Sequence, residues 1–228
     1  MTMRLLLISS SVVHGYGFLD QPEPYIQEFL GDRKVLAFIP FAAFDHAAYT
    51  ERVRERFARM GREIVGLDQI DHADAIFSGG GNTFRLLKTL YERNLLDDIR
   101  RRVRAGLSYV GSSAGSITSC PTIRTTNDMP IVMPPSFDAL AFIPFQLNCH
   151  YMDPDPTSTH KGETREERIR EFHEENTMPV VGLREGGCLR VDDDAITLMG
   201  MHSARIFLRG KEPFEAEVGT RLDQVTKG

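Results

Sequence analysis

Short apolar runs alternate with charged, helix-like stretches through the first half of this chain, and that alternation limits the folds open to it. Runs rich in β-branched and other apolar residues are typical of buried strands at 5–8, 35–39, 64–67, 75–77 and 107–110. Amphipathic helices are indicated between some of them, at 49–60, 84–91 and 95–103. Buried strands joined through helices form a parallel sheet covered on both faces. We therefore expect an α/β fold in which helices sandwich a parallel or mixed sheet.

The second half of the chain has a different character. The stretch 121–156 contains seven prolines and is expected to be loop-rich, which in a compact protein often marks function. A charged helix is expected at 163–175, and short strands follow at 180–183, 188–191, 195–198 and 205–208. A length of 228 residues suits one hydrophobic core, so we expect a single α/β domain over residues 1–228.

Charge and cysteine content exclude several classes of protein. The 27 basic and 32 acidic residues give a net charge of −5, which argues against a binder of nucleic acid or of a membrane surface. Three cysteines do not suggest a disulfide framework, and the apolar run at 5–8 is too short for a signal peptide or a membrane span. A cytoplasmic location is the expectation.

A Gly-x-Ser-x-Gly pattern at 111–115 places Ser113 between a predicted strand and a possible helix start. A sharp strand-to-helix turn would expose the Ser113 hydroxyl at the end of the sheet as a nucleophile. The same turn would direct the Ala114 amide N–H toward an oxyanion. The alternative is a loop that only packs a helix onto the sheet. Ser112 and Ser116 compete for the role of nucleophile but lack a glycine on both sides at this spacing.

A second glycine run, at 78–83, also follows a predicted strand. Converging amide N–H groups could bind an anion there, with the Gly81 N–H as the second oxyanion donor. A nucleotide-phosphate cradle is less favoured, because the run lacks the lysine of a P-loop and the Gly-x-Gly-x-x-Gly spacing. A turn that merely caps the next helix is the structural alternative.

A serine nucleophile needs a general base, and two of the seven histidines are suitably placed. His150 follows the strand-like run 145–148, and His160 lies in a polar stretch that resembles a mobile loop. Catalytic groups collect at strand ends, which favours His150. The carboxylate that orients the base is either Asp128, in a loop, or Glu185, directly after a predicted strand.

Arginines near these segments could bind an anionic substrate. Arg165 begins the charged stretch after the loop that carries the histidines, and Arg124 is a second candidate. A solvent-exposed helix with ion pairs between its own residues would give the same charge pattern. Cys149 beside His150 suggests a cysteine peptidase, but neighbouring side chains on an extended segment point in opposite directions, so we reject that reading.

Four motifs together resemble the dipeptidase E family, the aspartyl dipeptidases of serine peptidase family S51. They are Gly-x-Ser-Ala-Gly at 111–115, Gly-Gly-Gly-Asn-Thr-Phe at 79–84, the run from Cys120 to Pro130, and His-Lys-Gly-Glu-Thr-Arg-Glu at 160–166. The resemblance covers nearly the whole chain. It implies a flavodoxin-like or class I glutamine amidotransferase-like sandwich. It also implies cytoplasmic cleavage of small acidic dipeptides with N-terminal aspartate, without a metal or other cofactor; association into a homodimer stays open.

The resemblance also assigns residues. It implies that the nucleophile is Ser113, the base His150, and the third member Glu185 or Asp128. It further implies that Arg165 binds the substrate aspartate and that Gly81 is the oxyanion glycine.

The chain departs from the family pattern beside these residues. Ser112 replaces a tryptophan, Cys149 a proline and Arg184 a proline, which puts strict aspartate selectivity in question.

Three alternative functions follow from the same residues. A cyanophycinase-like hydrolase would cleave β-aspartyl bonds. A general esterase of the α/β-hydrolase type shares the Ser113 pattern, but that fold normally places its histidine late in the chain, whereas His150 comes only 150 − 113 = 37 positions after the serine. A catalytically inactive relative would bind acidic ligands through Arg165.

Overall fold

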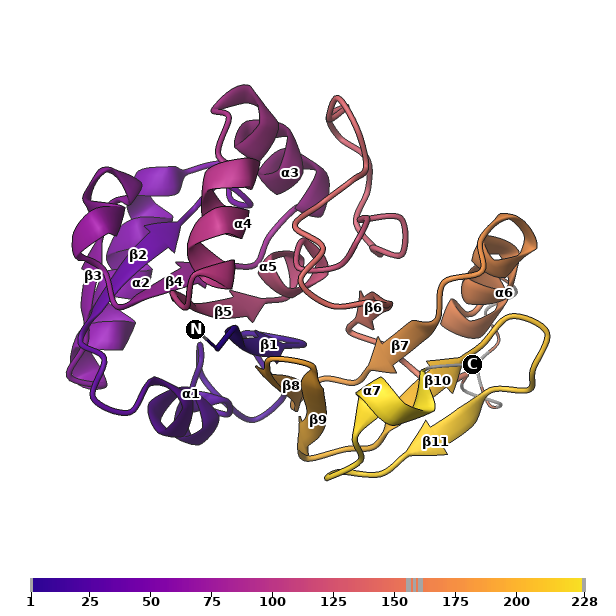
Figure 1. Ribbon diagram of the computed structural model, residues 1–228. Coiled ribbons are helices and arrows are strands. Elements are labelled where there is room, and N and C mark those ends of the chain that lie inside the picture. The colour runs from indigo at the N-terminus through magenta and orange to yellow at the C-terminus, as the bar shows by residue number, and fades with distance from the viewer. Residues whose placement is uncertain (1, 155–156, 158, 160–161, 227–228) are drawn as a thin grey trace.

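The computed structural model describes residues 2–154, 157, 159 and 162–226, and it contains a large and a small β-sheet (Figure 1). The large sheet has seven strands in the order β3-β2-β4-β5-β1-β8-β9. The first five of these are parallel, and β8 and β9 are antiparallel to their neighbours. The strands are β1 (Arg4–Ile8), β2 (Val35–Ile39), β3 (Glu63–Val65), β4 (Ala75–Ser78), β5 (Ser108–Ser112), β8 (Gly187–Asp192) and β9 (Ala195–Gly200).

Helices cover both faces of the large sheet. The alternation of side chains along β1 shows this division, because Leu5 and Leu7 belong to one buried cluster and Leu6 and Ile8 to another. The first cluster is completed by α3 (Thr83–Glu92), α4 (Leu96–Arg104) and α5 (Ala114–Ile117), and the second by α1 (Glu23–Leu30) and α2 (His46–Arg59). The expected α/β fold, a mixed sheet between helices, is confirmed.

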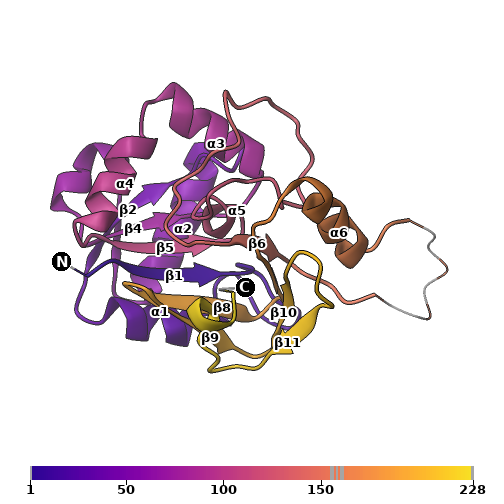
Figure 2. The same cartoon turned by 45° about the vertical axis from the view of Figure 1, so that its right-hand side comes forward.

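The small sheet has four strands in the order β11-β10-β7-β6. Its strands are β6 (Gln146–Cys149), β7 (Val180–Leu183), β10 (Ala204–Phe207) and β11 (Phe214–Ala216), of which β6 and β7 are parallel. The helix α6 (Arg165–Glu175) connects β6 to β7 and lies on the opposite side of the molecule from α4 (Figure 2). The remaining elements are the 3-10 helix η1 (Leu67–His72) and the short helix α7 (Leu222–Val225).

The expected C-terminal strands divide between the two sheets. Strand β8 lies beside β1 in the large sheet, and a turn at Asp193 leads from β8 into β9, which pairs antiparallel with β8. Strands β7 and β10 instead pair with each other in the small sheet. Three helical elements were not expected: α1, η1 and α7. The helix α1 is only eight residues long, and tertiary packing of Ile26, Phe29 and Leu30 against the sheet stabilises it. Among the described residues, no helix is long and apolar enough to cross a bilayer.

Carboxyl ends of strands from the large sheet and from the small sheet lie in the middle of the molecule. The carboxyl ends of the parallel strands β1, β4 and β5 lie side by side, because each pairs in register with its neighbour. The carboxyl ends of β6 and β7 lie beside each other in the same way. In α/β sheets, ligand sites form beyond such ends.

Candidate active site

Ser113 occupies a strained turn between β5 and α5. Its backbone has φ 52° and ψ −111°, a conformation that costs a non-glycine residue about 1–3 kcal/mol. The flanking glycines make the turn possible. A Cβ at Gly115 would lie 2.1 Å from the Ser78 carbonyl oxygen, and one at Gly111 would lie 2.7 Å from the Gly115 carbonyl oxygen. Close backbone contacts at this turn therefore require both glycines. The contact at Gly115 comes from β4, whose last residue is Ser78.

The neighbouring serines are unsuited to attack a substrate. Ser112 is fully buried, and its hydroxyl has no hydrogen-bond partner in the described part of the chain. Ser116 is also fully buried, and its hydroxyl donates to the Ile8 carbonyl at 2.7 Å. Only Ser113, of the three, lines the large pocket described below.

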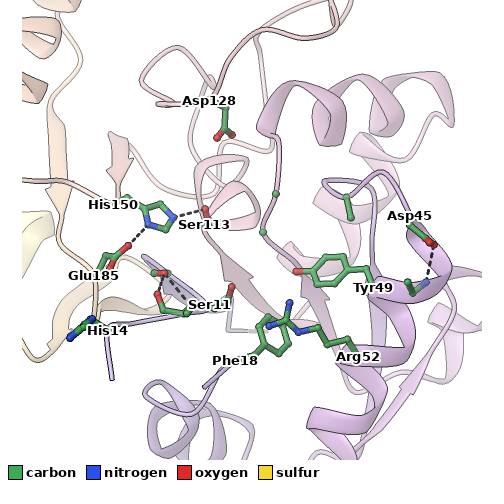
Figure 3. A pocket seen from close by; sticks show the side chains of 16 residues that line it. Ser11, His14, Phe18, Asp45, Tyr49, Arg52, Ser113, Asp128, His150 and Glu185 are labelled. Carbon is green, nitrogen blue, oxygen red and sulfur yellow. Dashed lines mark hydrogen bonds and ion pairs between the residues drawn. The ribbon is translucent and has the colours of Figure 1, made fainter. Parts of the chain in front are cut away.

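Ser113, His150 and Glu185 form one chain of hydrogen bonds (Figure 3). The Ser113 Oγ lies 2.9 Å from His150 Nε2, and His150 Nδ1 lies 2.8 Å from Glu185 Oε1. His150 directly follows β6, and Glu185 lies two residues beyond β7. The side chains of His150 and Glu185 are 39% and 45% exposed, so the imidazole is open to a ligand.

Asp128, the other candidate for orienting the imidazole, lies apart from this chain in Figure 3. Its carboxylate accepts hydrogen bonds from the Thr83 amide at 2.7 Å, from the Thr83 hydroxyl, and from the Thr126 hydroxyl at 3.2 Å. Thr83 is the first residue of α3, where a carboxylate interacts favourably with the helix dipole. The structure therefore places Glu185, and not Asp128, against His150.

Two backbone amides are free to bind an oxyanion beside Ser113. In the described part of the chain, neither the Gly81 N–H nor the Ala114 N–H has a hydrogen-bond acceptor. The glycine turn faces the serine, because a Cβ at Gly80 would lie 3.1 Å from the Ser113 Cβ. Gly81 has φ 138°, and a Cβ there would lie 2.5 Å from the Ala42 carbonyl oxygen, so this position also needs glycine.

Ser113, His150 and Glu185 all line a pocket of about 930 Å³. The other side of this pocket was not predicted from the sequence. Arg52, Tyr49 and Phe18 line it together with the expected residues (Figure 3). The Arg52 guanidinium lies over the Phe18 ring at 4.1 Å and has no carboxylate partner within the residues the structure describes. The only hint in the sequence is that Tyr49 and Arg52 are three positions apart on one helix, which places them on one face.

Tyr49 connects this part of the pocket to the glycine turn. Burial raises the pKa of Tyr49 to about 12, although the Gly80 N–H donates to its hydroxyl oxygen. A Cβ at Gly79 would lie 2.4 Å from that oxygen, so the absence of a side chain at Gly79 lets the ring pack against the turn. The phenol therefore stays neutral at physiological pH.

The arginines chosen from sequence lie outside the pocket lining. Arg165 is the first residue of α6, and burial lowers its pKa. Residues 155–156, 158 and 160–161, in the segment that leads to it, lie outside the described residues, and so does the alternative base His160. Arg124 lies over the Phe137 ring at 5.1 Å and lines a separate pocket with Arg168.

Two of the departures from the family pattern have clear surroundings. Cys149 is fully buried, and burial raises the pKa of its thiol well above the usual value, so no thiolate is available beside His150. Arg184 binds Asp153 at 2.6 Å and Glu215 at 2.9 Å. Arg184 thus connects the segment after His150 to β11 through the residue that precedes Glu185.

A serine at a strained strand-to-helix turn, a histidine on its hydroxyl and a carboxylate on the second ring nitrogen make up the arrangement found in serine hydrolases. Here that arrangement stands on a mixed α/β sheet. Free amides at two adjacent turns complete the set of groups that acyl transfer uses.

Comparison with known proteins agrees with this class. The model of peptidase family S51 matches residues 5–199. "Peptidase E" of Streptomyces coelicolor is 51% identical over 98% of this chain and 95% of its own. A Drosophila melanogaster protein named "Probable alpha-aspartyl dipeptidase" is 46% identical over 90% of this chain and 89% of its own. A crystal structure of a peptidase from an acI-B1 actinobacterium has the same fold, with a TM-score of 0.66, 17% identity and 95% coverage of each chain. The chain belongs to peptidase family S51.

Proposed function

We propose that this protein is a serine-type dipeptidase that hydrolyses dipeptides with N-terminal aspartate through an acyl-enzyme on Ser113. The observation that carries the proposal is the continuous contact from Ser113 Oγ through the His150 ring to Glu185, at 2.9 and 2.8 Å. Membership of family S51 and the names of the relatives support the choice of substrate. Three buried free cysteines fit a reducing cytoplasm as the location.

In the proposed reaction, His150 Nε2 takes the proton of the Ser113 hydroxyl while the Ser113 oxygen attacks the main-chain carbonyl carbon of the aspartyl residue. The Gly81 and Ala114 amides donate to the oxyanion that forms. His150 then gives the proton to the leaving amine, and the aspartyl group stays bonded to Ser113. Water, deprotonated by His150, attacks that ester; the proton then passes from His150 to the Ser113 oxygen and aspartate is released, while Glu185 stabilises the imidazolium in both steps.

An aspartyl dipeptide carries two carboxylates, on the aspartate side chain and at the C-terminus. By resemblance, Arg165 is proposed to bind the aspartate side chain. Arg52 lines the pocket and lacks a carboxylate partner in the described part of the chain, so we infer that it binds one of these groups as well.

The deciding experiment is hydrolysis of Asp-Leu by the wild-type protein and by Ser113→Ala. We expect wild-type turnover and a loss of kcat of at least about 1000-fold in the variant, with circular dichroism and Tm nearly unchanged. β-linked Asp-Leu and an ester panel serve as comparison substrates and are expected to react more slowly. Turnover of Asp-Leu by Ser113→Ala at the wild-type rate would refute the proposal.

A further inference from the structure

The three residues of the proposed acyl-transfer site stand on two different sheets. Ser113 follows β5 of the seven-stranded sheet, whereas His150 and Glu185 follow β6 and β7 of the four-stranded sheet. The hydrogen bonds of a sheet fix the spacing of its own strands but not its distance from another sheet. The 2.9 Å contact between Ser113 and His150 therefore depends on groups that connect the two sheets.

The Ser9 hydroxyl makes such a connection. Ser9 directly follows β1 in the large sheet and is fully buried. Its Oγ accepts a hydrogen bond from the His150 backbone N–H at 3.0 Å and donates to the Leu183 carbonyl at 2.7 Å. Leu183 is the last residue of β7, two positions before Glu185. One hydroxyl thus contacts the backbone that carries the base and the backbone that leads to the carboxylate.

The backbone of the same strand end contacts the third member. The Ser113 N–H donates to the Ile8 carbonyl at 2.9 Å, and the Ser9 N–H donates to the Gly187 carbonyl at 3.0 Å. Residues 8 and 9 therefore contact the segments on which all three groups of the site stand.

The hydrogen bond to Ser9 is made by the backbone of His150, which has an unfavourable conformation. His150 has φ 54°, a conformation that a residue with a Cβ adopts at a cost in energy, so surrounding contacts must maintain it. The Cys149 carbonyl, on the preceding peptide, accepts from the Asn127 side-chain amide at 2.8 Å. The His150 N–H is held by Ser9. The direction of the imidazole follows from this backbone.

We propose that Ser9 is a positioning residue that sets the distance between His150 and Ser113. Ser9 does not line the pocket, so it acts through His150 and Leu183 and not on the substrate. The inference rests on the proposed function of Ser113 and His150. Without the hydroxyl, the His150 N–H loses its hydrogen bond to the end of β1, and the Leu183 carbonyl keeps the Tyr151 N–H as a donor, at 3.2 Å. The ends of β6 and β7 are then held less firmly against β1. A displacement of about 1 Å at reacting groups can reduce a rate by about 100-fold.

Ser119 offers a matched control within the same core. It is also fully buried, and its hydroxyl donates to the Ser116 carbonyl at 2.6 Å. It makes no hydrogen bond to the residues that carry the base or the carboxylate within the described structure. Ser9→Ala and Ser119→Ala therefore remove the same group from equally buried positions, and only the first removes the connection between the sheets.

The experiment measures kcat and KM for Asp-Leu in the full-length variants, together with the rate at which diisopropyl fluorophosphate labels Ser113. In labelling, the serine oxygen bonds to phosphorus, fluoride leaves and the proton passes to His150, so the rate reports on the serine–histidine contact without a peptide. For Ser9→Ala we expect kcat and labelling to fall about 10- to 100-fold with KM within about 3-fold of wild type. For Ser119→Ala we expect both rates within about 2-fold of wild type.

A second variant guards against failure to fold. Ser9→Cys keeps a side chain of similar shape, but its thiol is a weak donor and acceptor, so slower turnover and labelling are expected there too. Wild-type kcat and labelling in folded Ser9→Ala or Ser9→Cys would overturn the proposal, and so would an equal loss in Ser119→Ala. If the wild-type protein fails to hydrolyse Asp-Leu, the proposed substrate is wrong, and the labelling rates still decide the role of Ser9.

Discussion

Ser113 and His150 both adopt positive φ, at 52° and 54°, although neither is glycine. Such conformations persist only where the surroundings impose them, and they are concentrated at functional sites. Hydrogen bonds from both backbone N–H groups, to the Ile8 carbonyl and the Ser9 hydroxyl, help to impose them here. The end of β1 therefore contributes to holding both residues in these conformations.

The two candidate carboxylates lead to opposite expectations for single variants. Glu185→Gln removes the charge beside His150 and is expected to lower kcat for Asp-Leu by about 100-fold or more. Asp128→Asn removes the charge at the start of α3, so we expect kcat within about 3-fold of wild type and a lower Tm. Steady-state kinetics and thermal unfolding of both variants check this. A larger loss of kcat in Asp128→Asn would reverse the assignment.

Arg52 provides a prediction about binding as distinct from chemistry. Arg52→Gln is expected to raise KM for Asp-Leu about 5- to 20-fold and to leave kcat within about 3-fold, because a charged hydrogen bond to the substrate is lost in ground and transition states alike. Arg54→Gln, which removes an arginine of the same helix that pairs with Glu51, is the control and should leave KM unchanged.

The same two variants, assayed with Asp-Leu-amide, show which carboxylate Arg52 binds. If Arg52 binds the C-terminal carboxylate, the amide substrate removes the difference between Arg52→Gln and wild type. If Arg52 binds the aspartate side chain, the difference persists. An unchanged KM for Asp-Leu in Arg52→Gln would contradict both possibilities.

At the scale of elements, turns that follow strands supply the proposed groups. The turn after β4 carries Gly81, and the turn after β5 carries Ser113 and Ala114. Contact between the two turns depends on Gly115, because the Ser78 carbonyl occupies the space that a Cβ would need. The pairing of β4 with β5 therefore brings the nucleophile and both proposed oxyanion donors together.

Arg184 stabilises the junction of β7, β11 and the segment after His150, and the stability that it contributes is expected to depend on pH. Its hydrogen bonds are the main cause that lowers the pKa of Asp153 below 3.8 and that of Glu215 below 4.5. A carboxylate with a lowered pKa in the folded state contributes stability above its ordinary pKa, and that contribution is lost as pH falls through the folded value.

We therefore expect Arg184→Met to lower Tm most above about pH 5, where both carboxylates are charged, and less as pH falls below their ordinary values. Methionine keeps an apolar stem that can pack against Tyr151, over which the guanidinium lies. Thermal unfolding of wild type and variant between pH 3 and pH 8 measures the difference. A difference in Tm that is constant with pH would show that Arg184 acts by packing alone.

At the scale of the whole molecule, the sequence predicted the elements better than their partners. The strand runs and amphipathic helices of the first half lie close to where periodicity places them, because burial on two faces imposes a continuous apolar run. The strands β7 to β10 were also predicted and β11 was not, but nothing local distinguishes β8, which pairs with β1, from β7, which pairs with β6. Strand pairing between distant segments depends on the packing of the entire chain.

The site divides in the same way. The Gly-x-Ser-x-Gly pattern, the second glycine run and His150 could be selected from sequence because local geometry, at glycines and strand ends, leaves a trace in residue type. The choice between Glu185 and Asp128 could not, since both carboxylates suit the role until the fold brings only one to the imidazole. Arg52 could not be selected from its spacing to Tyr49 alone, because an arginine on an exposed helix face is ordinary.

The sequence by itself thus determined the alternation of strands and helices, the turn that holds Ser113 and the residue types needed for acyl transfer, because each depends on local steric and hydrophobic rules. Only the tertiary structure decided that the large and small sheets meet at Ser113 and His150, that Glu185 completes the chain, and that Ser9 connects the two sheets. These depend on distances between segments far apart in sequence, and burial in a shared core sets them.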